Sequence, residues 1–195
     1  MLTEIRIAGF GGQGVILAAT VIGKAAAIFQ GAYATMTQSF GPEARGGSSS
    51  AQVVLCDTPI LYPYITQPDV LVVMSQEAYT RFSPELKAGG ILITEQELVR
   101  VDQIPEGVRV YAVPATRLAE ELGRRVVLNI VMVGFFCAVT GLLEPDAVRK
   151  AVADSVPSNM RKLDLDAFDK GFEYGKTAKV NGKHECEPVP SMENV

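Results

Sequence analysis

The spacing of apolar positions along the chain predicts an alternation of strands and helices. In residues 4–8 the apolar Ile5 and Ile7 alternate with charged neighbours, as in a strand with one buried face. Residues 15–29 are apolar on nearly every side, which predicts a helix packed against a sheet. Residues 70–74 are wholly apolar, which is typical of a central strand covered on both faces. Together these segments indicate an α/β protein.

The remaining segments predict further strands and helices and indicate the type of sheet. Residues 33–39 and 48–55 flank a glycine-rich loop, so we expect two strands that form a long hairpin-like excursion. Helical patterns gather late in the chain, which favours a mixed sheet over a regular doubly wound one. The predicted fold is a single α/β domain with a mixed, mostly parallel sheet, flanking helices and a Rossmann-like start. The other expected elements are strands at 91–94 and 108–113, helices at 114–122, 126–140, 145–152 and 163–174, and a helix cap at 75–77.

Composition supports one domain followed by a tail. The chain has 195 residues, 48% of them hydrophobic, which is enough to bury a sizeable core as one domain. We place the domain at residues 1–178 and a mobile tail at 179–195, because the last segment contains prolines and too few apolar residues to pack. The single histidine, His184, lies in this tail.

Charge excludes some classes of partner. The formal net charge is −4, whereas nucleic acids and anionic membranes attract basic surfaces. We therefore expect no nucleic-acid and no membrane partner, and any anion site must be local. The start of the chain lacks a signal-peptide pattern, and no apolar stretch reaches the roughly 20 residues needed to span a bilayer. We expect the protein in the cytoplasm.

Reactive side chains are few. Cys56, Cys137 and Cys186 are far apart in the sequence, so they form no zinc or iron–sulfur ligand set, and we predict no metal site. The serines at 48–50 lie in no nucleophile elbow and the only histidine is in the tail, which disfavours a hydrolytic triad. We assign no catalytic residue to this chain.

Two glycine-rich segments, residues 9–14 and 40–48, are the strongest candidates for binding, and no Asp or Glu lies between them. The first matches G-x-G-x-x-G between a strand and a helix, where backbone amides can enclose a phosphate. The acid that would bind a ribose is missing at 33–38, so NAD is disfavoured, whereas NADP and a tight turn that binds nothing both stay open. No Gly-Lys-Ser or Gly-Lys-Thr follows, so the segment is not a P-loop.

Arg45 brings a positive charge to the second segment. An arginine set between glycines allows a planar guanidinium and the backbone to approach a phosphate or carboxylate together. Ser48, Ser49 and Ser50 add hydroxyls beside it. The alternative is that a Glu43–Arg45 pair only braces its own loop.

These motifs resemble those of a known family. Gly-Gly-Gln-Gly at 11–14 and Gly-Pro-Glu-Ala-Arg-Gly-Gly at 41–47, followed by Ser-Gln-Glu-Ala-Tyr at 75–79, are similar to the gamma subunit of the 2-oxoacid:ferredoxin oxidoreductases. The similarity runs over residues 5–174 and includes the helix around 128–134. A free-standing chain of this length looks most like the 2-oxoglutarate (succinyl-CoA forming) branch, with pyruvate and 2-oxoisovalerate next. The 1–178 domain would then be a gamma-type domain.

The resemblance implies a complex that decarboxylates a 2-oxoacid on thiamine diphosphate. Electrons pass through an iron–sulfur cluster to ferredoxin, and the acyl group goes to coenzyme A. Thiamine diphosphate and the [4Fe-4S] cluster would be held by partner subunits, alpha and beta, and a ferredoxin-like delta subunit is left open. The gamma chain would help to bind coenzyme A and to cover the active site.

The resemblance also implies roles for particular residues. The first loop would surround coenzyme A, with backbone amides donating to its phosphates. The residues assigned to this loop are Gly11, Gly12, Gln13 and Gly14. The second loop would contact either coenzyme A or the alpha subunit, through Arg45, Gly46 and Gly47. Asn129 and Tyr79 are further candidates for this region, and a purely structural role is equally open for both.

Two other classes of function stay open. One is a nucleotide-binding regulatory module that works alone, with the glycine loop holding a nucleotide and Arg45 its phosphate. The other is an assembly subunit without a ligand, which predicts a large exposed apolar patch and instability of the isolated chain.

Overall fold

A six-stranded mixed sheet forms the centre of the computed structural model, which describes residues 2–41, 47–102, 104 and 106–181. The strand order is β2-β3-β1-β4-β5-β6. Strand β3 is antiparallel to both of its neighbours, and β1, β4, β5 and β6 pair in parallel. The prediction of a mixed, mostly parallel sheet is confirmed. The strands are β1 (Leu2–Phe10), β2 (Tyr33–Phe40), β3 (Ser48–Cys56), β4 (Val70–Val73), β5 (Ile91–Glu95) and β6 (Arg109–Val113).

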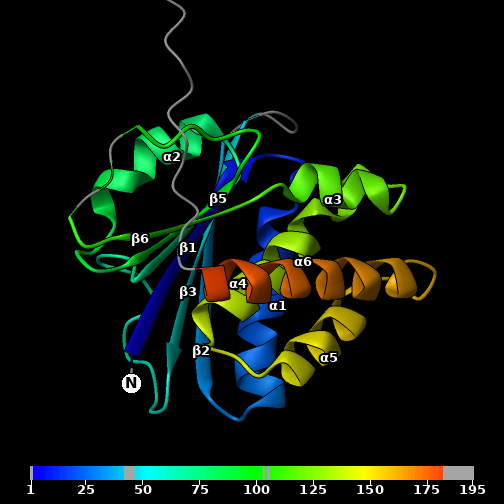
Figure 1. Cartoon of the computed structure of the whole chain (residues 1–195). Helices are drawn as coiled ribbons and strands as arrows, with labels where there is room; N and C mark the ends of the chain where they lie inside the picture. The colour runs from blue at the N-terminus through cyan, green and yellow to red at the C-terminus, as the bar shows by residue number, and fades with distance from the viewer. Residues whose placement is uncertain (1, 42–46, 103, 105, 182–195) are drawn as a thin grey trace, which may run out of the picture.

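The two faces of the sheet are covered unequally. Helix α2 covers one face, whereas α1 and α3 to α6 pack on the other (Figure 1). The helices are α1 (Val15–Lys24), α2 (Gln76–Phe82), α3 (Ala115–Glu121), α4 (Leu128–Thr140), α5 (Pro145–Ser155) and α6 (Arg161–Asn181). Short 3₁₀ turns, η2 (Ser83–Glu85) and η3 (Arg125–Val127), follow α2 and precede α4. No helix in the described part of the chain is long and apolar enough to cross a membrane.

Strand β4 explains why there are two apolar clusters. Its side chains alternate, so that Val70 and Val72 join the large cluster under the five helices, whereas Leu71 and Val73 join a smaller one under α2. All four are buried, which confirms the expectation of a central strand covered on both faces. Ser75 caps α2 as expected, because its hydroxyl accepts a hydrogen bond from the Ala78 amide.

Glycines allow α4 and α6 to cross in close contact. A Cβ atom on Gly171 of α6 would overlap the carbonyl oxygen of Val131, and one on Gly134 of α4 would overlap that of Phe168. A Cβ atom on Gly175 would lie 2.7 Å from that of Ala138. The two backbones therefore touch directly at this crossing, and no larger residue fits without moving a helix.

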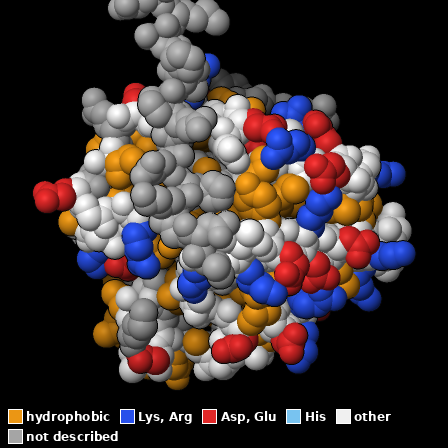
Figure 2. Space-filling model, in the orientation of Figure 1, with side chains coloured by type: hydrophobic (Ala, Val, Ile, Leu, Met, Phe, Trp, Pro, Cys, Tyr) orange, Lys and Arg blue, Asp and Glu red, His pale blue; other side chains and the backbone are white. Residues whose placement is uncertain are grey.

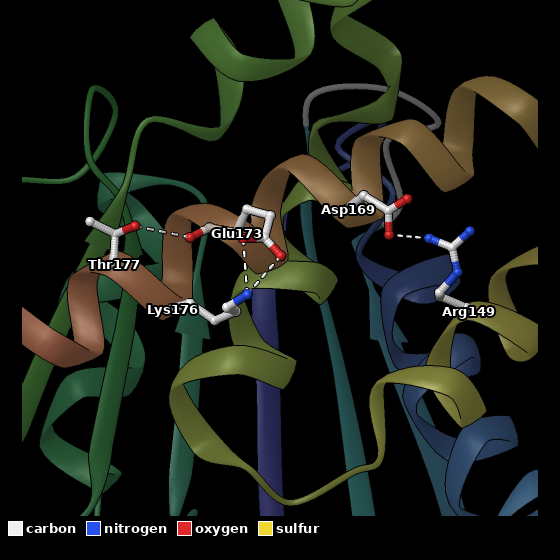
Figure 3. Close-up of polar contacts among 5 residues, drawn as sticks. All are labelled: Arg149, Asp169, Glu173, Lys176 and Thr177. Atoms are coloured by element: carbon white, nitrogen blue, oxygen red, sulfur yellow. Dashed lines mark hydrogen bonds and ion pairs between the residues drawn. The ribbon is translucent and has the colours of Figure 1, made fainter.

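The outer side of α6 is charged and links neighbouring helices. Arg149 of α5 pairs with Asp169 of α6, and Lys176 pairs with Glu173 one turn away (Figure 3). The Asp169 carboxylate raises the pKa of the Arg149 guanidinium. Acidic and basic side chains are interspersed over this helical side of the molecule (Figure 2). Such exposed pairs contribute little stability each, so the crossing rather than the charges holds α6 in place.

Two helices differ from their predicted extents. Residues 15–29 are helical as expected, but the last turn, η1 (Ala25–Phe29), is π-helical, a difference that apolar spacing does not encode. Helix α6 begins at Arg161 and continues to Asn181, beyond the predicted 163–174, because the additional turns are also buried: Gly175 packs against Ala138 of α4, and Ala178 is 3% exposed. Residues 182–195, with His184 and Cys186, lie outside the described residues, so the division at residue 178 stays a prediction.

Candidate functional site

The two glycine-rich segments meet at the carboxyl ends of the central strands. Phe10 at the end of β1 is the register partner of Ser48 at the start of β3. Beyond this pair the Gly11 amide donates a hydrogen bond of 2.8 Å to the Gly47 carbonyl oxygen. The antiparallel register of β1 and β3 therefore places residues 11–14 beside Gly47.

The same edge is a topological switch point of the sheet. Strand β1 leads into α1 on one face, whereas the adjacent and parallel β4 leads into α2 on the other. The two connections diverge at this edge, and a hollow lined by Gly9, Ser75 and Glu77 lies there on the side of α2. Ligands of open α/β sheets bind in crevices of this kind.

The first loop requires glycine at two positions because of its backbone conformation. Gly12 has φ of 99° and Gly14 has φ of 73°, both in the left-handed region that costs other residues roughly 1–2 kcal/mol. Gly14 is the residue before α1, and its carbonyl oxygen accepts the first helical hydrogen bond, from the Ala18 amide. The loop thus turns sharply from strand to helix within four residues.

Gln13 holds this loop in place with its side chain. Its Oε1 accepts a hydrogen bond of 2.7 Å from the Phe10 amide, and its Nε2 donates one of 2.7 Å to the Met74 carbonyl oxygen. A Cβ atom on Gly9 would lie 2.5 Å from that Oε1. The Gln13 side chain therefore fastens the loop to the end of β4 rather than presenting polar atoms to a ligand.

Asn129 supports the loop from α4. It is buried, and its Nδ2 donates a hydrogen bond of 3.3 Å to the Gly14 carbonyl oxygen. A Cβ atom on Gly14 would overlap the Asn129 side chain, so the two residues fit only as a pair. Tyr79 is also buried, in the small cluster with Phe82. The surroundings of Asn129 and Tyr79 therefore favour a role in packing and loop support over contact with a ligand.

The loop leaves a specific set of amides available. The amides of Gly11 and Gln13 already donate to the carbonyl oxygens of Gly47 and Phe10. The amides of Gly12 and Gly14 have no acceptor among the residues that the structure describes. Gly12 is exposed, and a Cβ atom there would meet nothing within 4 Å. The free donors are therefore these two amides and the first turn of α1, which contains no acidic residue.

Arg45 and Gly46 lie outside the described residues, as do Pro42, Glu43 and Ala44. A different cation, Arg81, lies beside the crevice. It belongs to α2 and lines a hollow with residues of β1, β2 and β3. The residues around this hollow are Gly9, Ser39, Ser48, Ser49, Ser50, Ser75, Glu77, Ala78, Arg81 and Phe82.

Sequence reasoning missed Arg81 because its place depends on how α2 packs across the sheet. One signal was present: Glu77 and Arg81 are four residues apart in a segment with a helix cap, so they lie on one face of a short helix. The hollow contains hydroxyls, one guanidinium and one carboxylate. Such a set can bind a polar, phosphorylated group.

Other chemically capable groups are committed to the fold. The Glu95 carboxylate is fully buried and accepts hydrogen bonds from the amides of Glu97, Leu98 and Thr116. Burial raises the pKa of the Cys137 thiol to about 12, so this thiol stays protonated at neutral pH. In the described ranges no three His, Cys, Asp or Glu side chains gather as a metal site would require.

Comparison with known proteins agrees with this architecture. Residues 4–174 match the model of the family described as pyruvate ferredoxin/flavodoxin oxidoreductase. The chain belongs to this family. It is 44% identical over 178 residues to the 2-oxoglutarate synthase subunit KorC of Methanocaldococcus jannaschii, covering 90% of this chain and 95% of that protein. The KorC subunit of Methanothermobacter thermautotrophicus is 47% identical over 87% of this chain and 93% of that protein.

Solved structures give the same result. The gamma subunit of a keto/oxoacid ferredoxin oxidoreductase from Geobacter sulfurreducens superimposes with a TM-score of 0.82 at 38% identity, covering 91% of this chain and 98% of that one. The 2-oxoglutarate:ferredoxin oxidoreductase of Magnetococcus marinus, solved with 2-oxoglutarate, coenzyme A and succinyl-CoA bound, superimposes with a TM-score of 0.82 at 26% identity. The match covers 90% of this chain but 31% of that longer chain. The resemblance to the gamma subunits, and to the 2-oxoglutarate branch in particular, is confirmed.

Proposed function

We propose that this chain is the gamma subunit of a 2-oxoglutarate:ferredoxin oxidoreductase and that its glycine loop binds part of coenzyme A beside the active site. The reaction converts 2-oxoglutarate, coenzyme A and oxidised ferredoxin to succinyl-CoA, CO₂ and reduced ferredoxin. The similarity of this chain to the KorC subunits of 2-oxoglutarate synthases supports 2-oxoglutarate as the substrate. Pyruvate is the second choice, because the pyruvate synthase subunit PorC of Methanothermobacter thermautotrophicus is 31% identical over 92% of this chain.

One observation carries the proposed role in coenzyme A binding. The amides of Gly12 and Gly14 have no acceptor among the described residues, and they adjoin the first turn of α1, whose amides are left without partners inside the helix. Coenzyme A brings a pyrophosphate, which needs several directional donors and no nearby acid. The chain supplies the donors here, and neither the loop at 11–14 nor the first turn of α1 contains an acidic residue.

The rest of the reaction is assigned to partners. Alpha and beta subunits would hold thiamine diphosphate and the [4Fe-4S] cluster, and ferredoxin would accept the electrons. Exposed apolar side chains support extensive contacts with such partners. Leu61 is 96% exposed, and Tyr62 and Tyr64 beside it are 64% and 53% exposed. Aromatic residues in this setting are typical of protein interfaces.

The test uses the complex purified through a tag on this chain. The Gly12→Val substitution places a side chain in the open space beside the loop. We therefore expect the KM for coenzyme A to rise about tenfold or more, whereas the KM for 2-oxoglutarate should stay unchanged. Gly123→Val is the matched control, because Gly123 also has positive φ and open space but lies at the end of α3. If the two variants had the same KM for coenzyme A, the glycine loop would not be the coenzyme A-binding segment.

The same purification separates the alternative classes. Co-purification of thiamine and iron–sulfur subunits, with turnover on 2-oxoglutarate, is the expected result. A chain that purifies alone, inert towards a panel of 2-oxoacids but retaining a nucleotide, would instead establish the stand-alone binding module.

A further inference from the structure

The amino ends of the parallel strands surround a pocket at the edge of the sheet opposite to the glycine loop. We call it the amino-end pocket. The first residues of β4, β5 and β6 line it, namely Val70, Ile91 and Arg109, and its volume is about 400 Å³. Small ligands of open α/β sheets bind at the carboxyl ends of the strands, so the position of this pocket favours a different kind of occupant.

The amino-end pocket combines an apolar surface with an unpaired positive charge. Leu2 lines the pocket and is 59% exposed. Arg109 is exposed, and no described carboxylate lies within ion-pair distance of its guanidinium. Lys87 also lines the pocket, but it pairs with Asp69 at 2.8 Å, so its charge is offset. A segment that fits this surface therefore carries both apolar side chains and carboxylates.

Helix α6 ends beside the same pocket. Thr140 and Leu142, which follow one another at the end of α4 with one residue between them, line the pocket. A Cβ atom on the intervening Gly141 would lie 3.7 Å from Nζ of Lys179, in the last turn of α6. Lys179 is exposed and has no carboxylate partner among the described residues. The chain thus leaves α6 at the border of the pocket and adds a second unpaired cation there.

The sequence after α6 has the complementary character. Residues 182–195 contain three glutamates and one lysine, and Val189 stands between two prolines. A residue before a proline favours an extended backbone over a helix, and extended proline-containing segments dock in grooves. These 14 residues, at up to about 3.3 Å each, are long enough to cross the pocket.

From these observations we propose that residues 182–195 fold back over the amino-end pocket and fasten the end of α6 to the sheet. Glutamates of this segment pair with Arg109 and Lys179, and Val189 packs against Leu2. Because the segment is tethered to α6, its effective concentration at the pocket is on the order of millimolar, so a weak contact is enough to hold it. The pocket lies at the edge opposite to the glycine loop, so this contact does not depend on the proposed function.

A spin label on Cys186 reports the position of the segment by NMR of the full chain, after removal of any purification tag. Burial raises the pKa of the Cys137 thiol to about 12, so this thiol does not react with the label. Cys56→Ser removes the other described thiol. We expect the label to raise the transverse relaxation rates of the amides of Ala88 and Gly89, which line the pocket.

Three variants test the charge pairing. Arg109→Glu should lower the equilibrium constant for docking about tenfold, and with it the relaxation enhancement at the pocket, because attraction becomes repulsion. Arg109→Lys keeps the charge and should retain most of the enhancement. Arg124→Glu is the matched control, because Arg124 is also exposed and unpaired in the described structure but lies before the start of α4, at the far end from Thr140. It should leave the enhancement unchanged.

Two results would overturn the proposal. One is enhancement confined to the end of α6, with none at Ala88 and Gly89, because the segment would then not reach the pocket. The other is equal enhancement in the Arg109→Glu and Arg124→Glu chains, because the contact would then not depend on the charge at the pocket.

Discussion

Glycines serve opposite purposes at two places in this molecule. At the crossing of α4 and α6, Gly134 and Gly171 are needed because another backbone occupies the space of a side chain. In the loop after β1, Gly12 is needed because of its positive φ, and the space of its side chain is open. A missing Cβ atom thus marks tight packing in one region and an accessible amide in the other. The pattern of glycines in a sequence does not distinguish these cases, but the neighbours in space do.

The largest effect is expected at the helix crossing. Gly171→Ala would force its Cβ atom against the Val131 carbonyl oxygen, so we expect a loss of about 3 kcal/mol or more in the free energy of unfolding. Urea denaturation of the full chain measures this loss.

The matched control is Gly23→Ala. Gly23 also lies inside a helix, α1, but a Cβ atom there meets nothing within 4 Å. This change should stabilise the protein by about 0.5–1 kcal/mol, because alanine is the better helix former. A similar loss in both variants would mean that the close crossing does not account for the glycine at 171.

Gly14→Ala should have an intermediate effect, because it combines strain with overlap. The new Cβ atom adopts positive φ and meets the Asn129 side chain, for a total of about 2–3 kcal/mol. A double-mutant cycle with Asn129→Ala isolates the overlap. In that background the cost of Gly14→Ala should fall to about 1 kcal/mol of strain alone. Strictly additive losses would contradict the contact between the two residues.

The smallest effect on stability is expected at Gly12. Gly12→Ala should cost about 1 kcal/mol, because only backbone strain is added. Gly123→Ala should cost the same, since its φ of 87° and its open surroundings are similar. Thermal unfolding of the two variants checks this equality. A much greater loss of stability in Gly12→Ala than in Gly123→Ala would mean that a side chain at position 12 does not enter open space.

The order of strands and helices was predictable because apolar spacing is set by the period of each element. The strand at 70–74 and the long hairpin at 33–55 are examples, since their side chains alternate or are wholly buried. The reversal of β3 followed from the shortness of the loop between β2 and β3. The full length of α6 was not predictable in this way, because its last turns are buried through small residues, Gly175 and Ala178, which add little to the apolar pattern.

The candidate site was predictable only in part. The glycine loop was identified from its spacing, but the task of Gln13 depends on Met74, which lies 61 positions later in the chain. Arg81 was missed for the same reason, since α2 reaches the hollow only after the sheet has formed. Local patterns thus indicate where a loop will turn, whereas the groups that surround it come from distant segments.

Strand β3 connects the glycine loop with an exposed apolar segment at the other end of the strand. Nine residues, rising about 3.3 Å each, span roughly 30 Å, and both neighbouring strands pair with β3 along its length. One end leads from Gly47, next to the glycine loop, and the other leads to the segment with Leu61, Tyr62 and Tyr64. Because both edges of β3 are paired, the strand joins these two ends as one rigid element of the sheet.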